Sequence, residues 1–187
     1  MPSENIDLQP TLIGRRILLR PLEPGDWEAL FAAARDPLIW AVHPAHDRWT
    51  EPVFRRYFAD ALASGGALVV IDSDNGEVIG SSRYERSRAA PGEVEIGWTF
   101  LIRRHWGGAT NAEMKRLMIA HALRYFERVI FMVGEGNLRS RRAMEKVGAR
   151  LTERTLDSEM AGRVARHVIY AIDRADFAQG LATRYPV

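Results

Sequence analysis

Apolar residues near the start of the chain follow first a strand-like and then a helix-like spacing. Residues 15–22, RRILLRPL, are rich in branched side chains and predict a strand that ends at Pro21. Residues 26–34 repeat apolar side chains at helical spacing, which predicts a helix with Asp26 as its cap. Residues 36–49 contain two prolines, so we expect a loop or broken helix there, followed by a second helix from about residue 50.

The middle of the chain changes to a period of two. Residues 67–85 hold two apolar runs separated by Asp74-Asn75-Gly76, a turn sequence that accepts positive backbone angles and predicts a hairpin. After a Pro91-Gly92 turn, residues 94–102 alternate and predict a third strand. We expect one face of this strand to carry Val94, Ile96, Trp98 and Phe100, and the other to carry Glu95, Gly97 and Thr99.

Helical and strand-like segments then alternate to the end of the chain. A helix is expected around Met114 and Met118, followed by a short buried strand at residues 128–133. Another helix is expected between Asn137, a typical N-terminal cap, and Gly148, a typical stop. Two further strands, residues 149–156 and 166–172, precede a short tail helix.

The order of these elements is β-α-α-β-β-β-α-β-α-β-β. A hairpin-linked sheet joined to a β-α-β crossover predicts a mixed α/β or α+β domain rather than an all-parallel nucleotide-binding fold. The chain has 187 residues, and domains usually span roughly 100–200 residues. We therefore expect a single domain, residues 1–187.

Composition narrows the chemistry. Apolar residues make up 47% and charged residues 27% of the chain, as in globular proteins. No apolar run has the length of a membrane span and the N-terminus lacks the order of a signal peptide, so we expect a cytoplasmic protein without a membrane partner. The absence of cysteine excludes disulfides, thiolate metal sites and cysteine nucleophiles. No His, Asp or Glu grouping has metal-ligand spacing, so no metal is expected.

Basic residues are almost all arginines. Of 26 lysines and arginines only Lys115 and Lys146 are lysines, yet the net charge is +2 because acidic residues are interspersed. Arginine binds phosphate and carboxylate groups through a planar fork, but it is also an ordinary surface residue. A nucleic-acid-binding role is not favoured, since no stacking aromatics accompany the arginines around NLRSRR.

A glycine pair marks the turn between the third strand and the following helix. Residues 103–118 read RRHWGGATNAEMKRLM. The first turn of a helix has free N–H groups, and glycine lets an anion approach the backbone. A tight turn that needs glycine for its shape alone is the alternative, because neither the dinucleotide fingerprint nor the ATP phosphate loop is present.

This segment, together with the one after it, is similar in sequence to a known protein family. WGGATNAEMKRLM followed by VIFMVGEGNLRSRRAMEKVGA resembles the acyl-CoA-binding core of the GNAT acetyltransferase superfamily, in the branch of ribosomal-protein N-terminal acetyltransferases. It extends from about residue 15 to residue 172. It implies a central, mostly antiparallel twisted sheet of about six to seven strands, flanking helices and a β-α-β acyl-CoA-binding core. The family's phosphate loop aligns here either on Arg104, Gly107 and Ala109 or, as we prefer, on Trp106, Ala109 and Asn111.

The resemblance implies acetyl-CoA as co-substrate and assigns the residues that bind it. The strand from Glu95 to Leu101, with Trp98, Thr99 and Phe100, would pair its backbone with the pantetheine arm. An N–H near Trp98 or Thr99 would polarise the thioester carbonyl. Asn137 would bond the pantetheine or the acceptor, or act only as a helix cap. The pyrophosphate would be held by the loop, namely Arg103, Arg104, Trp106, Gly107, Gly108, Ala109, Thr110 and Asn111, with more weight on its N–H groups than on the arginines.

The resemblance also implies transfer of the acetyl group to a primary amine, either a peptide N-terminus or a small amine. Ser140 is the candidate acid for the departing thiolate, because the tyrosine that many members use is replaced near Met144. A serine that bonds only to its own helix is the alternative. Glu85 and Glu95 are the candidate bases for the attacking amine, or ordinary strand-surface charges.

Two readings of function and several properties stay open. The alternative to an enzyme is a GNAT-fold protein that binds CoA or acyl-CoA without turnover. The acceptor would be selected mainly by the early helices and by residues 40–49, where Trp40, Trp49 and His43 either line the acceptor side or only pack the loop. A lone loop histidine such as His43 is usually solvated. A homodimer is left open.

Overall fold

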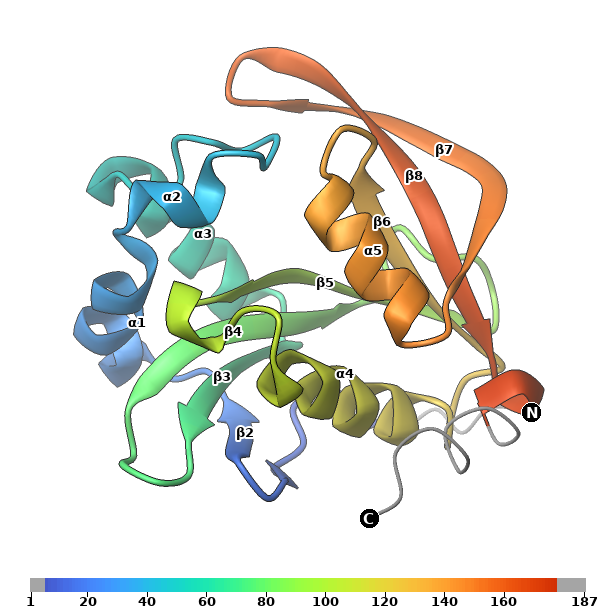
Figure 1. The fold of residues 1–187 in the computed structure, drawn as a ribbon, viewed down its shortest axis with the longest axis horizontal. Coiled ribbons are helices and arrows are strands. Elements are labelled where there is room, and N and C mark those ends of the chain that lie inside the picture. Colours follow the sequence, from blue (N-terminus) through green and yellow to red (C-terminus); the bar gives the residue numbers. More distant parts are fainter. Residues whose placement is uncertain (1–5, 178–187) are drawn as a thin grey trace.

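A twisted eight-stranded sheet forms the centre of the computed structural model, which describes residues 6–177 (Figure 1). Its strand order is β1-β2-β3-β4-β5-β6-β8-β7, and only β5 and β6 pair in parallel. The strands are β1 (Leu12–Ile13), β2 (Ile17–Pro21), β3 (Ala67–Asp72), β4 (Val78–Glu85), β5 (Glu93–Leu101), β6 (Arg128–Gly134), β7 (Arg150–Met160) and β8 (Arg163–Asp173). The expected fold class is confirmed. The sheet has one strand more than the pattern predicted, because two residues of β1 are too few to show a period.

Helices cover both faces of this sheet. They are α1 (Trp27–Ala34), α2 (Pro37–Trp40), α3 (Glu51–Ala63), α4 (Ala109–Ala122) and α5 (Leu138–Lys146), with short 3-10 turns η1 (Pro24–Asp26) and η2 (Arg103–His105). Met114 and Met118 of α4 and Met144 of α5 pack into one apolar cluster with the sheet. Leu30 of α1 and Phe54 of α3 belong to a second cluster on the opposite face. The predicted helices are thus confirmed.

The helix caps are partly as predicted. The Asn137 carboxamide accepts a hydrogen bond from the Ser140 N–H at 3.2 Å, and α5 ends before Gly148, whose φ is +87°. The prediction for Asp26 is wrong in its detail. Its carboxylate bonds to the Arg20 guanidinium and to the Glu23 N–H instead of capping α1, because η1 precedes that helix and brings Arg20 within reach.

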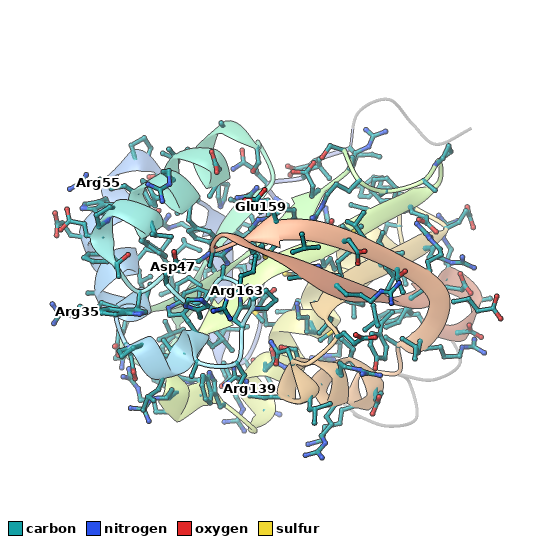
Figure 2. All side chains as sticks on the ribbon, turned by 90° about the horizontal axis from the view of Figure 1, so that it is seen from above. Arg35, Asp47, Arg55, Arg139, Glu159 and Arg163 are labelled. Carbon is teal, nitrogen blue, oxygen red and sulfur yellow. The ribbon has the colours of Figure 1, made fainter. Side chains whose placement is uncertain are left out.

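The last two strands form a longer hairpin than the sequence pattern predicted. They continue to a tight turn at Ala161 and Gly162, both with positive φ. In Figures 1 and 2 this hairpin arches over the sheet toward the loop between α2 and α3. The tail helix that was expected after it falls largely outside the described residues. Within residues 6–177 no helix combines the length and apolar character that crossing a membrane requires.

The face assignment predicted for β5 is wrong beyond Ile96. One extra residue in β5 disrupts its pairing with β4 between Gly97 and Phe100, and Trp98 there has a φ of +50°. Such a bulge shifts the alternation, so residues before and after it point to opposite faces. Val94 and Ile96 pack in the α4 cluster, whereas Phe100 packs with α3 in the other.

The sheet splits at its only parallel pair. Strands β5 and β6 pair only from Glu93 to Glu95, opposite Arg128 to Ile130, while β6 stays paired with β8 along its whole length. Beyond Glu95 the two strands diverge. The remaining edge of β5, which includes the bulge, therefore faces a gap within the sheet.

Candidate active site

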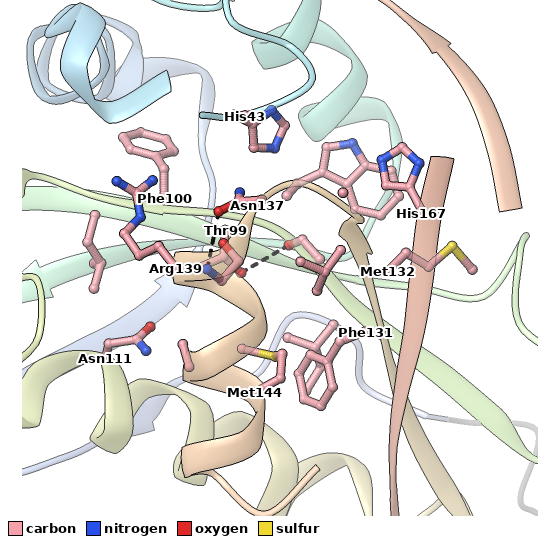
Figure 3. A pocket seen from close by; sticks show the side chains of 18 of the residues that line it. His43, Thr99, Phe100, Asn111, Phe131, Met132, Asn137, Arg139, Met144 and His167 are labelled. Atoms are coloured by element: carbon pink, nitrogen blue, oxygen red, sulfur yellow. Dashed lines mark hydrogen bonds between the residues drawn. The ribbon is translucent and has the colours of Figure 1, made fainter. Parts of the chain in front are cut away.

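The gap between β5 and β6 is a cavity of about 210 Å³. Figure 3 shows that its walls come from both strands, from α4 and α5, and from the loop after α2. Nine of the predicted catalytic and co-substrate-binding residues line it: Glu95, Trp98, Thr99, Phe100, Trp106, Gly107, Asn111, Asn137 and Ser140. The structure thus brings together most of the predicted site residues, from separate segments of the chain.

The β5 wall exposes backbone groups because of the bulge. The extra residue of a bulge is left out of the ladder, and β6 has already diverged on the other side. The Trp98 carbonyl is held by a 2.8 Å hydrogen bond from the Tyr57 hydroxyl of α3. An extended chain lying in the gap would meet free N–H and C=O groups along β5, as an added strand does.

The loop between β5 and α4 closes one end of the cavity, which we call the loop end (Trp106, Gly107 and Asn111). Gly107 has a φ of +67°, and extended Gly108 is the N-terminal cap of α4. The N–H groups of the first helical turn have no partners within the helix. Trp106 is fixed by a bond from its indole N–H to the Leu101 carbonyl. The glycine pair thus places the N-terminus of α4, a type of position that favours negative charge, beside the cavity.

Other predicted loop residues do not line the cavity. Arg103 pairs with Asp36, and Arg104 pairs with Glu77, both at the surface. The Thr110 hydroxyl lies 3.2 Å from His105 Nδ1. Trp106, Gly107 and Asn111 of the loop thus face the cavity, and neither arginine does.

Helix α5 supplies the opposite wall. Asn137 is 3% exposed and holds the Ser140 N–H, and Ser140 lines the cavity together with Ala143 and Met144. Arg139 stacks on Trp106, with 3.8 Å between guanidinium carbon and ring centroid. It also donates to the Ile39 carbonyl at 3.1 Å, which joins α5 to α2 across the cavity.

A buried carboxylate lies at the other end. Glu95 is 1% exposed, lines the cavity and forms a two-pronged ion pair with Arg88 at 2.6 and 3.1 Å. Burial raises the pKa of Glu95, although Arg88 opposes this. A β-carbon on Gly97 would lie 2.8 Å from the Glu95 carboxylate, so a larger residue there would push this carboxylate away from its present position.

The chain is similar to a known family over most of its length. The model of the acetyltransferase (GNAT) domain family matches residues 16–150. The chain belongs to this family. Its fold and its enzyme class follow: the protein is an acetyltransferase, and the family implies acetyl-CoA as co-substrate. The gap, the free β5 edge and the α4 terminus suit a molecule with an extended arm and a pyrophosphate.

Solved structures agree on the GNAT fold. A GCN5-related N-acetyltransferase from Brucella melitensis superposes with a TM-score of 0.79 at 22% identity, over 91% of this chain and 81% of that one. An acetyltransferase structure from T. thermophilus gives 0.74 at 26% identity, over 94% and 97%. A structure from Vibrio cholerae assigned as a ribosomal-protein-serine acetyltransferase gives 0.70 at 12% identity, over 87% and 97%, and so shows the fold alone. No curated protein matches the chain.

The two candidate bases are placed differently in this GNAT domain. Glu95 lies in the cavity, but Glu85 does not line it. The Glu85 carboxylate instead accepts the N–H groups of Arg86 and Ser87, each at 2.9 Å, and these bonds lower its pKa despite partial burial. Glu85 therefore fixes the turn after β4.

Lys115, which was not among the predicted site residues, also lines the cavity. It is 3% exposed, and its ammonium nitrogen lies 2.8 Å from the Thr99 hydroxyl, which in turn bonds to Ser82 at 2.7 Å. Burial lowers the pKa of Lys115 to about 7, although Glu95 opposes this. A signal existed: Lys115 is one of two lysines in an arginine-rich chain and follows Met114 on an apolar helix face.

The loop after α2 forms the roof of the cavity. Pro44 packs so closely on β6 that a β-carbon on Gly134 would lie 2.7 Å from its ring. Trp40 and His43 line the cavity, whereas Trp49 is exposed. The expectation that His43 is solvated is wrong: burial, with Arg48 nearby, lowers its pKa to about 3. Its Nδ1 accepts the Ala45 N–H at 2.9 Å.

Arginines surround the end of the cavity that contains Glu95, and the sequence did not predict this cluster. We call Arg48 and Arg88, with Arg83 behind them, the arginine end. Arg48 and Arg88 line the cavity, and the guanidinium groups of Arg83 and Arg88 each lie 4.4 Å from the Trp98 ring centroid. Arg48 and Arg88 lie in two different loops and Arg83 lies in β4, so no local sequence pattern links them. Among the described residues, no cluster of His, Cys, Asp or Glu side chains has the makings of a metal site.

Proposed function

We propose that this acetyltransferase moves an acetyl group from acetyl-CoA directly to a primary amine, a small amine or a peptide N-terminus. The observation that carries the proposal is the gap between β5 and β6, which joins a free strand edge to a helix N-terminus and encloses Glu95 and Ser140. Direct transfer is favoured because the chain has no cysteine and no serine in a nucleophile elbow.

Binding is assigned to the backbone on one side of the cavity. The free edge of β5 pairs with the pantetheine arm, and the N–H groups from Trp106 to Asn111 bind the pyrophosphate. Asn137 bonds the arm or the acceptor. A backbone N–H of the Trp98–Thr99 bulge donates to the thioester carbonyl oxygen, where negative charge grows as the amine attacks.

Proton transfers are assigned to two side chains. Only the neutral amine is nucleophilic, so Glu95 accepts the proton that the amine loses, directly or through water. The new C–N bond forms as the C–S bond breaks, and Ser140 donates a proton or hydrogen bond to the departing sulfur. The raised pKa of Glu95 supports its role, because a base whose pKa lies nearer neutrality is more effective.

Purified protein tests the proposal. It is titrated with acetyl-CoA and CoA by calorimetry and then assayed for thiol release with a panel of amines and amidated peptides. We expect saturable binding of both nucleotides and turnover of at least one acceptor class. No binding of acetyl-CoA or CoA contradicts the proposal, and binding with no turnover of any amine favours the non-catalytic alternative.

A further inference from the structure

The arginine end carries more positive than negative charge. Of the described residues that line the cavity there, Arg48 and Arg88 are cationic, Lys115 has its pKa lowered to about 7 by burial, and Glu95 is the only carboxylate. His43 contributes no charge at neutral pH, because its pKa is lowered to about 3. Glu95 is already engaged by Arg88. Arg48 therefore has no carboxylate of its own among the described lining residues.

Arg48 is held by aromatic rings rather than by an acid. Its guanidinium carbon lies 4.7 Å from the Tyr57 ring centroid and 5.2 Å from that of Trp40. Within residues 6–177, no carboxylate lies in ion-pair distance of it. Stacking on aromatic faces orients a guanidinium and leaves its N–H donors available at the edge.

Among the described residues, Arg83 adds a second guanidinium without an ion-pair contact behind this wall, with Glu85, Asp60 and Glu95 acting on it only at longer range. It is 5% exposed, and its Nε and Nη2 have no hydrogen-bond partner in the described part of the chain. Its guanidinium lies over Trp98, next to the bulge. A buried charge without a partner is costly, and in native proteins such a group calls for an explanation.

This charge distribution bears on the acceptor. The amine approaches in part as an ammonium ion, which the guanidinium of Arg48 in the cavity wall and that of Arg83 behind it repel. If the acceptor also carries a negatively charged group, this group is attracted to the guanidinium groups. Arginine is suited to this task, because its fork matches the oxygens of a carboxylate or phosphate.

We propose that the acceptor is an amine that also bears a carboxylate or phosphate group, and that Arg48 binds this group while Glu95 receives the proton of the amine. The inference rests on the proposed function and narrows its substrate class. Trp40, Tyr57 and Trp98 position the guanidinium groups. The long β7–β8 hairpin, whose Met160 also lines the cavity, covers the acceptor from above.

Matched acceptor pairs test the inference in the thiol-release assay. β-Alanine is compared with propylamine, and O-phosphoethanolamine with ethanolamine, while amidated Ala-Asp and Ala-Asn peptides form the peptide arm. We expect kcat/KM to be about tenfold to a hundredfold higher for the anionic member of a pair, the usual worth of a charge-assisted bond. The arm with the largest ratio identifies the source of the anionic group. Ratios of one or less in all three arms overturn the inference but leave the proposed function intact.

Variants assign the effect to Arg48. In Arg48→Gln the ratio of kcat/KM between the anionic and neutral members of a pair should collapse to within about threefold, because the anionic group loses its partner. Arg48→Lys should keep part of the preference, because it keeps the charge without the fork. Arg56→Gln, an exposed arginine of α3, is the matched control and should leave the preference unchanged. A preference that survives in Arg48→Gln, or a loss of CoA binding instead, overturns the inference.

A binding measurement covers the case in which no amine of the panel turns over. Inorganic phosphate is titrated into CoA-saturated protein while tryptophan fluorescence is followed, since Trp40 and Trp98 contact the arginines. Saturable binding that Arg48→Gln abolishes supports the inference, and its absence overturns it. Failure to bind CoA at all is a separate result, which removes the proposed function and the inference together.

Discussion

At the loop end the cavity is bounded by main chain, and at the arginine end it is bounded by side chains from distant segments. Gly107 and the start of α4 present N–H groups whose direction is fixed by the helix itself. Arg48 and Arg88 depend on the packing of Trp40, Tyr57 and Trp98 for their positions. In the function proposed above, the co-substrate would contact mainly backbone groups, whereas the acceptor would contact side chains that substitution can readily change.

The largest expected effect comes from Glu95→Gln. Loss of the proton acceptor should lower kcat by about 10²–10⁴-fold, with the Kd of acetyl-CoA unchanged. In the parent enzyme kcat should fall as the pH falls through the raised pKa of Glu95, since a protonated carboxyl accepts no proton. Steady-state kinetics from about pH 5 to 9 measure both.

The matched comparison is Glu85→Gln, on the neighbouring strand and outside the cavity. Its kcat should stay near the parent value. If Glu85→Gln lowered kcat strongly and Glu95→Gln did not, the base would lie outside the cavity, and the assignment of the acceptor to the arginine end would be wrong.

A smaller loss of kcat is expected for Ser140→Ala. Removal of one hydroxyl that stabilises a departing thiolate should cost about tenfold to a hundredfold. The defect should shrink as pH rises above about 8.5, the ordinary pKa of a thiol, because the thiolate then leaves without help. A defect that is the same at every pH would indicate a structural role, and unchanged turnover would exclude Ser140 as the acid.

Ala109→Pro tests whether backbone N–H groups carry the loop end. Proline is tolerated at the first position of a helix, and extended Gly108, with a ψ of −169°, suits a following proline. The variant removes one N–H donor, so Kd for CoA should rise about tenfold, with unfolding temperature little changed.

Arg103→Gln and Arg104→Gln sharpen this test. Both side chains pair with surface carboxylates, so their loss should weaken CoA binding less than Ala109→Pro does. Calorimetry compares the three variants. A larger effect of either arginine would move the phosphate site from the backbone to the side chains.

The smallest effect concerns Lys115, between the two ends. Its pKa of about 7 lies below the ordinary value of 10.5, so between these values the unfolded chain binds more protons. Stability should therefore rise with pH over this window, by at most about 1.4 kcal/mol per pH unit. Lys115→Met should remove this rise, and Lys146→Met, at the exposed second lysine, should not. Urea unfolding at several pH values measures it, and equal slopes in both variants would show that Lys115 is not the source.

The same contrast explains how far the sequence predicts the site. Gly107, Asn137 and Ser140 are set by local rules for turns and helix caps, so their placement followed from the order of elements. The bulge at Trp98 left no mark in the alternation of β5, because it depends on pairing with β4. Arg48, Arg83 and Arg88 meet only after the sheet and its loops are assembled, and Lys115 becomes buried when α4 packs it against Thr99 of β5 and Phe131 of β6.

Amide hydrogen exchange with saturating CoA can show whether the co-substrate lies along the free edge of β5 and on the start of α4. We expect slower exchange at the amides of Trp98 to Leu101 and of Gly107 to Asn111, with little change in the loop around Arg48. Protection confined to that loop, or no protection at β5 and α4, would contradict this placement of the co-substrate.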